Sequence, residues 1–230
     1  MNICLIPARI GSKRLKKKNI INFYGKPLIS YIIAEAVKSK IFDEIIVSTD
    51  SKKIKDISIN CGAKIYFKRP KKLCSDQTTT FQIINHSIKY FQSKNIKINN
   101  LCCIYPTAIL LTSQHIKKSF HIFKKNKKRF LFSAQKFDHP IQRAIIQKNN
   151  GIKILNKFFL NTQSNHLPTY YHDAGQFYWG SPKQWLNNNS IFQNTSIIYP
   201  LARYEAVDIN VKEDLELAKI LFKLRKYNYK

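Results

Sequence analysis

The most basic stretch near the start of the chain is "IPARIGSKRLKKKN", residues 6–19. It follows the apolar run "NICLI" and carries six cationic side chains among small residues: Arg9, Lys13, Arg14, Lys16, Lys17 and Lys18. Gly11 and Ser12 allow a ligand to approach the backbone, and Arg and Lys can surround a polyphosphate with charge and hydrogen-bond donors. The stretch contains neither GxxxxGK[ST] nor GxGxxG, two common phosphate-loop patterns. It therefore indicates either a phosphate-binding loop of another kind or an ordinary solvated basic loop.

The remaining positive charge is spread over the whole chain. The formal net charge is +27, from 40 Lys and Arg against 13 Asp and Glu, and such a balance is typical of proteins that bind nucleic acid or anionic membrane surfaces. Here, however, the basic residues do not alternate with aromatic residues in the manner of RNA-binding modules. We interpret them as solvated faces and expect no nucleic-acid or membrane partner. A basic nucleic-acid-binding protein is the alternative from a different functional class.

The cysteines and apolar runs bear on the cellular compartment. The chain has five cysteines, an odd number, and no CxxC pair, so we expect reduced thiols and not a disulfide framework. No apolar run approaches the roughly 18 residues of a membrane span, and "NICLI" is too short, and on the wrong side of its charges, for a signal peptide. The sequence predicts a cytoplasmic protein.

The elements that must position the first loop alternate between two patterns. Short apolar runs predict strands at "NICLIPA", "EIIVSTD", "AKIYFKR", "LCCIYPT" and "RFLFSAQ", and helical patterns such as "PLISYIIAEAVKS" and "TTTFQIINHSIKYFQSK" separate them. Continuous apolar strands separated by helices of about 10 to 15 residues predict an α/β, doubly wound fold with a mainly parallel sheet covered on both faces. Ligands bind beyond the carboxyl ends of such strands, where the first loop lies.

The pattern changes from about residue 137. Short extended pieces, "HPIQRAIIQKNNGIKIL" and "AGQFYWGSP", predict a hairpin or a projecting subdomain over residues 137–180. Regularity returns with the strand "SIIYPL" and a last helix, "KEDLELAKILFKLRK", in which Leu215, Ala218 and Phe222 keep helical spacing. We see no linker that requires a second domain, and predict one domain over residues 1–230.

Several motifs, in order, resemble a known family. "IPARIGSKRLKKKN" is similar to the nucleotide-binding loop of the cytidylyltransferases that activate sialic acids and related nine-carbon acids as CMP-sugars. "GKPLISYII", "IIVSTDS", "KRPKKLCSDQTTT", "YPT" and "DIN...EDLELA" follow in the family's order, so that the resemblance covers residue 1 to about 222. It implies a three-layer α/β/α Rossmann-like nucleotidyltransferase fold. It also implies transfer of CMP from CTP to the anomeric hydroxyl of a nonulosonic acid, with release of pyrophosphate.

Two stretches resemble one branch of this family. "HPIQRA" at 139–144 and "YHDAGQFYWG" at 171–180 are similar to the enzymes for pseudaminic acid, whereas sialic acid enzymes usually show "NGAIY" at the second place and "LQPTSP" where this chain has "IYPTAI". We therefore expect pseudaminic acid as the acceptor. Enzymes for legionaminic, N-acetylneuraminic or 3-deoxy-octulosonic acid are the alternatives within the same reaction. A glycosyltransferase of related fold, which needs an interior Asp-x-Asp, is a further alternative.

The resemblance assigns the nucleotide to the first loop and to the segment before the third helix. Arg9, Lys13 and Lys18 match the basic positions that hold the triphosphate, and their charge would offset that developing on the α-phosphate and pyrophosphate, so they are the expected catalytic residues. Further nucleotide-binding positions are Ala8, Gly11, Ser12, Asn19, Arg69, Asp76 and Thr79. Arg69 matches a position that contacts cytosine. For Asp76 and Thr79 the alternative is a helix N-cap built from Ser75, Asp76 and Thr78.

The resemblance assigns the sugar to residues 137–180 and to the end of the fourth strand. The expected sugar-binding residues are Tyr105, Gln142, Arg143, His172, Asp173 and Gln176. Arg143 can pair bidentately with the carboxylate of the acid, and the others can bind its amide and hydroxyl groups. No covalent step is required, so His172 is expected to orient the ligand. The neighbouring Phe177, Tyr178 and Trp179 are expected in the core, with the alternative that one of them lines the pocket.

The resemblance also implies a metal ion and a second subunit. Mg²⁺ prefers a few carboxylates together with phosphate oxygens and water. The family pattern near the C-terminus is Asp-x-Asp, but this chain has Asp208-Ile209-Asn210, so we expect Asp208 and Asn210 as ligands of a weaker site. The alternative is that the two close a turn before the last helix. Family members are commonly dimers, and we expect a homodimer in which residues 137–180 reach toward the neighbouring subunit.

Overall fold

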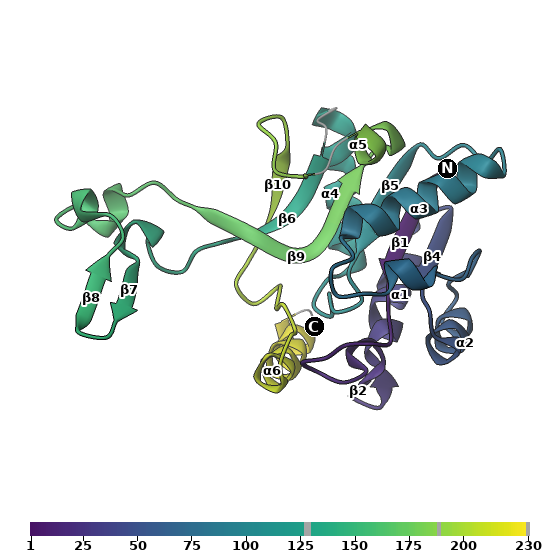
Figure 1. The fold of residues 1–230 in the computed structure, drawn as a ribbon, viewed down its shortest axis with the longest axis horizontal. Helices are drawn as coiled ribbons and strands as arrows, with labels where there is room; N and C mark the ends of the chain where they lie inside the picture. The colour runs from purple at the N-terminus through teal and green to yellow at the C-terminus, as the bar shows by residue number, and fades with distance from the viewer. Residues whose placement is uncertain (127–129, 188–189, 229–230) are drawn as a thin grey trace.

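A computed structural model describes residues 1–126, 130–187 and 190–228. Its centre is a six-stranded sheet in the order β10-β6-β9-β5-β1-β4 (Figure 1). The strands are β1 (Asn2–Pro7), β4 (Glu44–Ser48), β5 (Asn100–Ile104), β6 (Phe130–Lys136), β9 (Tyr171–Gly180) and β10 (Ile197–Leu201). β1 pairs in parallel with β4 and β5, and β10 pairs in parallel with β6, whereas β9 is antiparallel to both β5 and β6.

Helices cover both faces of the sheet. They are α1 (Leu28–Ser39), α2 (Lys52–Asn60), α3 (Thr80–Ser93), α4 (Ser113–Asn126) and α5 (Pro182–Asn187). The last helix, α6 (Lys212–Asn228), packs in a separate cluster with Phe23 and Leu28. Alternate residues of β1 face opposite sides: Cys4 and Ile6 pack in the cluster that includes α1, α2 and α4, while Ile3 and Leu5 pack with α3 and α5. The predicted three-layer α/β fold is therefore confirmed.

The strand expected at "AKIYFKR" does not form. In the described chain this segment makes one bridge, between Ile46 and Lys64, beyond the edge strand β4. The chain then turns inward, because the backbone N–H of Arg69 donates to the Thr49 carbonyl, and the ring of Phe67 packs against His86 of α3. The prediction was wrong because the segment pairs with the edge of β4 only at Lys64, after which the contacts of Phe67 and Arg69 carry it away from that edge.

A small arm projects away from the sheet between β6 and β9. It holds the hairpin β7 (Ile145–Lys148) and β8 (Gly151–Ile154), and Figure 1 shows it at the far end of the long strand β9. The predicted projection over 137–180 is seen, but its last ten residues are β9 itself, a central strand of the main sheet. A second short ribbon, β2 (Asn22–Phe23) with β3 (Lys26–Pro27), leads into α1.

The surface agrees with the interpretation of the charge. Lysines of the clusters "DSKKIK" and "IKKSF" are exposed, while the basic residues at 127–129 and the side chains from 226 onward lie outside the described residues. All five cysteines are free thiols. Among the described helices, none combines the length and the apolar character that a membrane crossing requires.

Candidate active site

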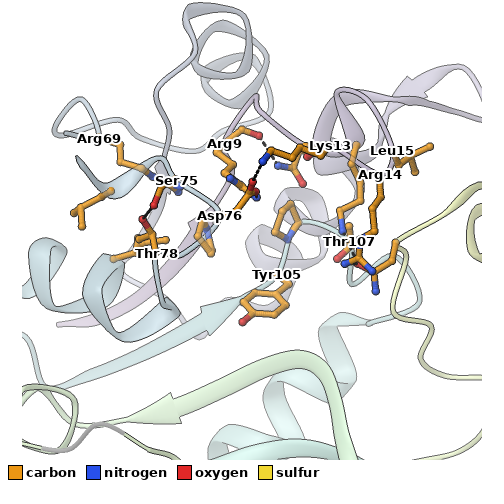
Figure 2. A pocket seen from close by; sticks show the side chains of 18 residues that line it. Arg9, Lys13, Arg14, Leu15, Arg69, Ser75, Asp76, Thr78, Tyr105 and Thr107 are labelled. Carbon is orange, nitrogen blue, oxygen red and sulfur yellow. Dashed lines mark hydrogen bonds and ion pairs between the residues drawn. The ribbon is translucent and has the colours of Figure 1, made fainter. Parts of the chain in front are cut away.

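The largest group of candidate residues surrounds one cavity of about 610 Å³ at the carboxyl ends of β1 and β5 (Figure 2). Four segments contribute to it: the loop after β1, the segment that precedes α3, the residues that follow β5, and the loop before α6. The cationic lining residues are Arg9, Lys13, Arg14, Lys18 and Arg69. A cavity with five cations at the carboxyl edge of a mainly parallel sheet is suited to a polyphosphate.

The loop after β1 is held by buried hydrogen bonds at its two ends. Where it leaves the strand, the buried Ala8 donates its N–H to the Ser48 carbonyl, and Ile10 N donates to Asp50 Oδ1. Where it ends, the Asn19 side chain donates to the Arg9 carbonyl over 2.8 Å. Asn19 therefore supports the loop and also lines the cavity. A Cβ on Gly11 would meet no atom of the described chain within 4 Å, which leaves space for a ligand against the backbone.

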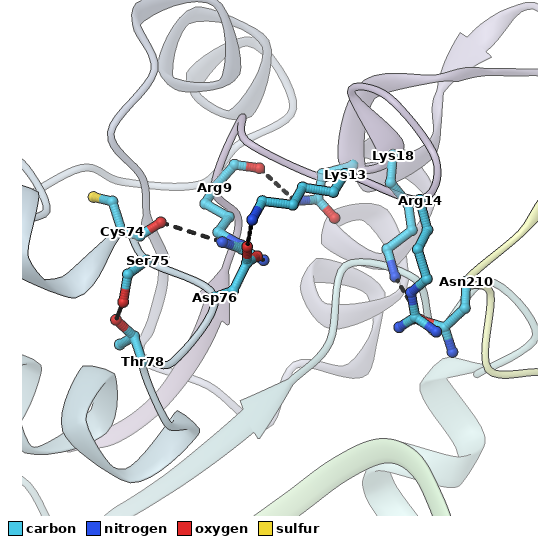
Figure 3. Close-up of polar contacts among 10 residues, drawn as sticks. Arg9, Lys13, Arg14, Lys18, Cys74, Ser75, Asp76, Thr78 and Asn210 are labelled. Atoms are coloured by element: carbon cyan, nitrogen blue, oxygen red, sulfur yellow. Dashed lines mark hydrogen bonds and ion pairs between the residues drawn. The ribbon is translucent and has the colours of Figure 1, made fainter.

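Two cations of this loop share one carboxylate. Lys13 Nζ lies 2.6 Å from Asp76 Oδ2, and the Arg9 guanidinium pairs with Asp76 Oδ1 (Figure 3). The hydrogen bonds from Lys13 and Arg9 lower the pKa of Asp76. Arg9 also donates to the Cys74 carbonyl over 3.2 Å. The segment before α3 is thus joined to the loop by ion pairs that a phosphate group can replace.

Arg69 is the most buried of the cavity's cations. It is 2% exposed, and its guanidinium donates to the Ser48 hydroxyl and to the Ser48 carbonyl. Burial lowers the pKa of Arg69 from its ordinary value, although an arginine remains protonated at neutral pH. Its position beside the end of β4 is fixed before a ligand binds.

The start of α3 decides one of the open alternatives. The N-cap is Thr79, whose hydroxyl accepts from Gln82 N while Gln82 Oε1 accepts from Thr79 N, a capping box. The cap therefore does not consist of Ser75, Asp76 and Thr78. These three line the cavity instead, and the Ser75 and Thr78 hydroxyls lie 3.0 Å apart.

The candidate metal residues lie at the other end of the cavity. Asn210 lines it, and its side-chain N–H donates to Asp208 Oδ2 over 2.7 Å. Asn210 Oδ1 accepts from Arg14 at 2.8 Å and from Lys18 at 3.3 Å. Burial lowers the pKa of Lys18, and the nearby Asp208 opposes that shift. Arg14 was not among the assigned residues, and its position next to Lys13 in the basic loop was the signal available for it.

A smaller cavity of about 160 Å³ adjoins the first, with Tyr105 lining both. The Tyr105 hydroxyl lies 2.6 Å from Thr80 Oγ1, and Tyr178 donates to Asp173 Oδ2 over 2.8 Å. Burial raises the pKa of Tyr105 to about 12 and raises that of Asp173 from its ordinary value. Phe81, Trp185 and Ile191 complete its lining. Of the predicted sugar-binding residues, Tyr105 and Asp173 are brought together here.

The other predicted sugar-binding residues lie elsewhere. Gln176 is 1% exposed, and its side chain donates to the Ala174 carbonyl. Gln142 and Arg143 belong to the arm, where Gln142 donates to the Pro168 carbonyl and Arg143 to the Thr162 carbonyl. His172 is exposed at the start of β9. These four side chains are not among the residues that line the two cavities within the described chain. Phe177, Tyr178 and Trp179 are buried, as predicted, and Tyr178 also lines the smaller cavity, the alternative left open for one of them.

A mainly parallel α/β sheet with a cation-lined cavity at its carboxyl edge is typical of enzymes that bind a nucleotide or another phosphate compound. The family model for cytidylyltransferases matches residues 3–227. The chain therefore belongs to the cytidylyltransferase family, and the resemblance found in its motifs is confirmed.

Individual relatives align with nearly the whole chain. A pseudaminic acid cytidylyltransferase of Campylobacter jejuni is 42% identical over 224 residues, which are 97% of each chain. A CMP-N,N'-diacetyllegionaminic acid synthase of Legionella pneumophila is 29% identical over 96% of each. Among solved structures, a CMP:2-keto-3-deoxy-manno-octonic acid synthetase complexed with CTP aligns with a TM-score of 0.70 at 12% identity, covering 97% of this chain and 99% of that one. The last likeness supports the fold.

Proposed function

We propose that the protein transfers CMP from CTP to the anomeric hydroxyl of pseudaminic acid and releases pyrophosphate. The proposed use of CTP rests on the cavity lined by Arg9, Lys13, Arg14 and Lys18, whose charge suits a triphosphate. The acceptor rests on the pseudaminic acid cytidylyltransferase that is 42% identical over 97% of the chain.

The chemistry follows from the charge of the cavity. The oxygen of the anomeric hydroxyl attacks the α-phosphorus of CTP, and a new P–O bond forms. The bond between the α-phosphorus and the oxygen that bridges to the β-phosphate breaks, pyrophosphate leaves, and the proton of the hydroxyl is released to the solvent. Negative charge grows on the phosphate oxygens and on the leaving pyrophosphate, where fixed Arg and Lys donors stabilise it. Lys18 is suited to this task because its ammonium is held by the Ile209 carbonyl at 2.6 Å and needs little rearrangement.

Cytosine has a fixed partner in this proposal. Arg69 is buried at the end of β4, on the side of the cavity that holds Ser75 and Thr78, opposite Arg14 (Figure 2). Two of its N–H groups already bond to Ser48, so its plane is fixed and the remaining donors can contact the base. Asp76 and Thr79 remain predicted contacts of the nucleoside.

Mg²⁺ enters with the nucleotide. The described residues contain no group of three or more His, Cys, Asp or Glu side chains that could hold a metal by themselves. Asp208 offers one carboxylate, which fits an ion whose other ligands are phosphate oxygens and water. The Asn210 oxygen already accepts hydrogen bonds from Arg14 and Lys18, so it is the weaker ligand of the two. Bound Mg²⁺ would neutralise phosphate charge next to these side chains.

The sugar is proposed to lie beyond Tyr105, toward the smaller cavity. There the Thr80 and Tyr105 hydroxyls and the Asp173 carboxylate can bind hydroxyl and amide groups of the acid, next to the apolar side chains of Phe81 and Trp185. The anomeric hydroxyl would then face the larger cavity, where the α-phosphate of CTP lies.

A second copy of the chain would complete the site. Arg143 and Gln142 sit on the projecting arm, away from the two cavities of their own chain, and a nearby subunit could receive them (Figure 1). The arm is apolar on its surface: Ile145 and Ile152 are 60% and 64% exposed. Such exposure is typical of a surface that another protein covers. We propose a homodimer in which Arg143 of one subunit binds the sugar carboxylate in the other.

The reaction is tested by pyrophosphate release with CTP and Mg²⁺ in the presence of pseudaminic, legionaminic or N-acetylneuraminic acid, with a sugar-free control. Preference for pseudaminic acid supports the whole proposal, and preference for another acid retains the reaction and rejects the acceptor. Release with none of the acids would contradict the reaction itself. We propose a cytoplasmic location because free thiols and a CTP substrate are typical of that compartment.

A further inference from the structure

Arg14 and Asn210 form a contact between the two ends of the chain. Arg14 lies in the loop after β1, Asn210 lies in the loop before α6, and Arg14 Nη2 is 2.8 Å from Asn210 Oδ1. Lys18 reaches the same oxygen at 3.3 Å, and Figure 3 shows the three side chains gathered at one end of the cavity. Asn210 is therefore a shared acceptor for two cations.

The orientation of the Asn210 amide follows from its neighbours. Its N–H donates to Asp208 Oδ2, and its own backbone N–H donates to Asp214 Oδ2, both over 2.7 Å. The opposite orientation would turn the amide N–H groups toward Arg14 and Lys18, which offer no acceptor. Donors on one side and a carboxylate on the other thus fix the amide oxygen toward the two cations.

The lack of charge on Asn210 matters for these cations. At the opposite end of the cavity Arg9 and Lys13 are paired with the Asp76 carboxylate, which offsets part of their charge. An amide oxygen holds a guanidinium by a hydrogen bond without neutralising it. Arg14 has five N–H donors, and because it lines the cavity, donors beyond the one given to Asn210 can reach a ligand there.

We propose that Asn210 is a positioning residue: it holds Arg14 toward the phosphate chain of the nucleotide while leaving the charge of Arg14, and that of Lys18, available to the phosphates. This rests on the proposed use of CTP. An aspartate at position 210 would instead form an ion pair with Arg14 and Lys18 and bring a second carboxylate beside Asp208.

CTP binding and Mn²⁺ binding together test the proposal, because a general loss of structure would weaken both. CTP affinity is measured in EDTA by isothermal titration calorimetry, and Mn²⁺ affinity is measured by electron paramagnetic resonance without nucleotide. Asn210→Asp is expected to weaken CTP binding about fivefold by neutralising the cations, and to tighten Mn²⁺ binding by a similar factor. The two changes have opposite signs, which a merely structural role of Asn210 would not produce.

The arginine is tested in the same assay. Arg14→Ala is expected to weaken CTP binding in EDTA about tenfold, and Arg14→Lys is expected to recover part of it, since a charged donor remains. Lys16→Ala is the matched control, because Lys16 is an exposed cation of the same loop that is not among the residues lining the cavity in the described chain. It is expected to change the affinity by less than about twofold.

A double variant tests whether Asn210 acts through Arg14. If Asn210 acts through Arg14, Asn210→Asp weakens CTP binding less in the Arg14→Ala background than in the wild type, so the two effects are not additive. Full additivity, or an Arg14→Ala affinity equal to that of Lys16→Ala, would overturn the inference while leaving the CTP reaction standing. A wild-type protein that binds no CTP would reject the proposed function as well.

Discussion

Lys13 Nζ lies 2.6 Å from Asp76 Oδ2, so the loop after β1 and the segment before α3 are joined across the nucleotide cavity. Arg9 pairs with the other oxygen of the same carboxylate. Two of the cations assigned to the triphosphate are therefore partly neutralised in the absence of a ligand. A phosphate chain must compete with Asp76 for both of them.

Replacing this carboxylate is expected to separate phosphate binding from nucleoside binding. In Asp76→Asn no charge competes for Arg9 and Lys13, so inorganic tripolyphosphate should bind about threefold more tightly at low salt. If Asp76 also holds the nucleoside, CTP gains less than tripolyphosphate does. Calorimetry with both ligands measures the difference. Asp56→Asn, the same change on the exposed side of α2, is the control, and weaker tripolyphosphate binding by Asp76→Asn would contradict the prediction.

Gly11→Ala is expected to affect the ligand and not the fold. A Cβ at this position meets no atom of the described chain within 4 Å, and Gly11 does not have a positive φ, so the melting temperature should stay the same or rise slightly. The methyl group would occupy space next to the backbone where a phosphate is expected to approach, and CTP affinity should fall at least about threefold. Calorimetry and thermal melting on the same preparation test the prediction, and unchanged CTP affinity would contradict it.

Gly180→Ala is expected to destabilise the fold and to leave CTP binding unchanged. Its Cβ would lie 2.8 Å from Trp185 Nε1 and 2.9 Å from Phe130 Cε1, in a packed part of the core. Such overpacking typically costs about 1 to 3 kcal/mol of unfolding free energy. Urea denaturation should show this loss, whereas CTP affinity measured well below the melting temperature should remain close to that of the wild type. Equal stability of variant and wild type would show that the two rings move aside freely.

The sequence predicted the local features of the fold, but not the contacts between segments that are far apart in the chain. The strands β1 and β5 and the helix α1 were predicted correctly. Their apolar runs and 3.6-residue spacing are local signals, because each reflects whether successive side chains are buried. The family motifs brought Arg9, Lys13 and Lys18 to one cavity. Periodicity carries no information on strand order, so the antiparallel insertion of β9 between β5 and β6 was not foreseen. Nor was the contact of Arg14 with Asn210, 196 residues further along the chain.

The Asp173 carboxyl is expected to give the protein a specific dependence of stability on pH. Burial raises its pKa, although hydrogen bonds from Gly175 N and Tyr178 act in the opposite direction. The folded protein therefore holds this proton more tightly than the unfolded chain does. The resulting stabilisation is complete below the ordinary value of 3.8 and is lost as the pH rises through the raised pKa of the folded state.

Asp173→Asn removes this ionisation while keeping an oxygen acceptor for Gly175. Relative to the wild type, its unfolding free energy should increase as the pH is raised above the ordinary value of 3.8, and then stay constant above the raised pKa of the folded state. Urea denaturation at a series of pH values measures the difference between the two proteins. A relative stability of Asp173→Asn that falls as the pH is raised would contradict the burial argument.

The arm offers the sharpest test of the proposed dimer. In the β7–β8 hairpin Ile145 pairs with Ile154 and Gln147 pairs with Ile152, so Ile145, Ile152 and Ile154 share one face. Ile145 and Ile152 are at least 60% exposed, which in water is unfavourable for a cluster of this kind. Ile152→Glu would place a charge in the centre of that face and should give a monomer in analytical ultracentrifugation.

The same variant tells whether the partner completes the sugar site. CTP affinity should remain that of the wild type, because the cavity around Arg9 and Lys13 is formed within one chain. Pyrophosphate release at low sugar concentration should fall at least about tenfold, because the monomer lacks the partner's cation for the sugar carboxylate. Ile59→Glu, a charge on an exposed isoleucine of α2, is the control and should retain both dimer and activity. A monomeric Ile152→Glu protein with full activity would mean that one chain binds the sugar alone, without Arg143 from a second copy.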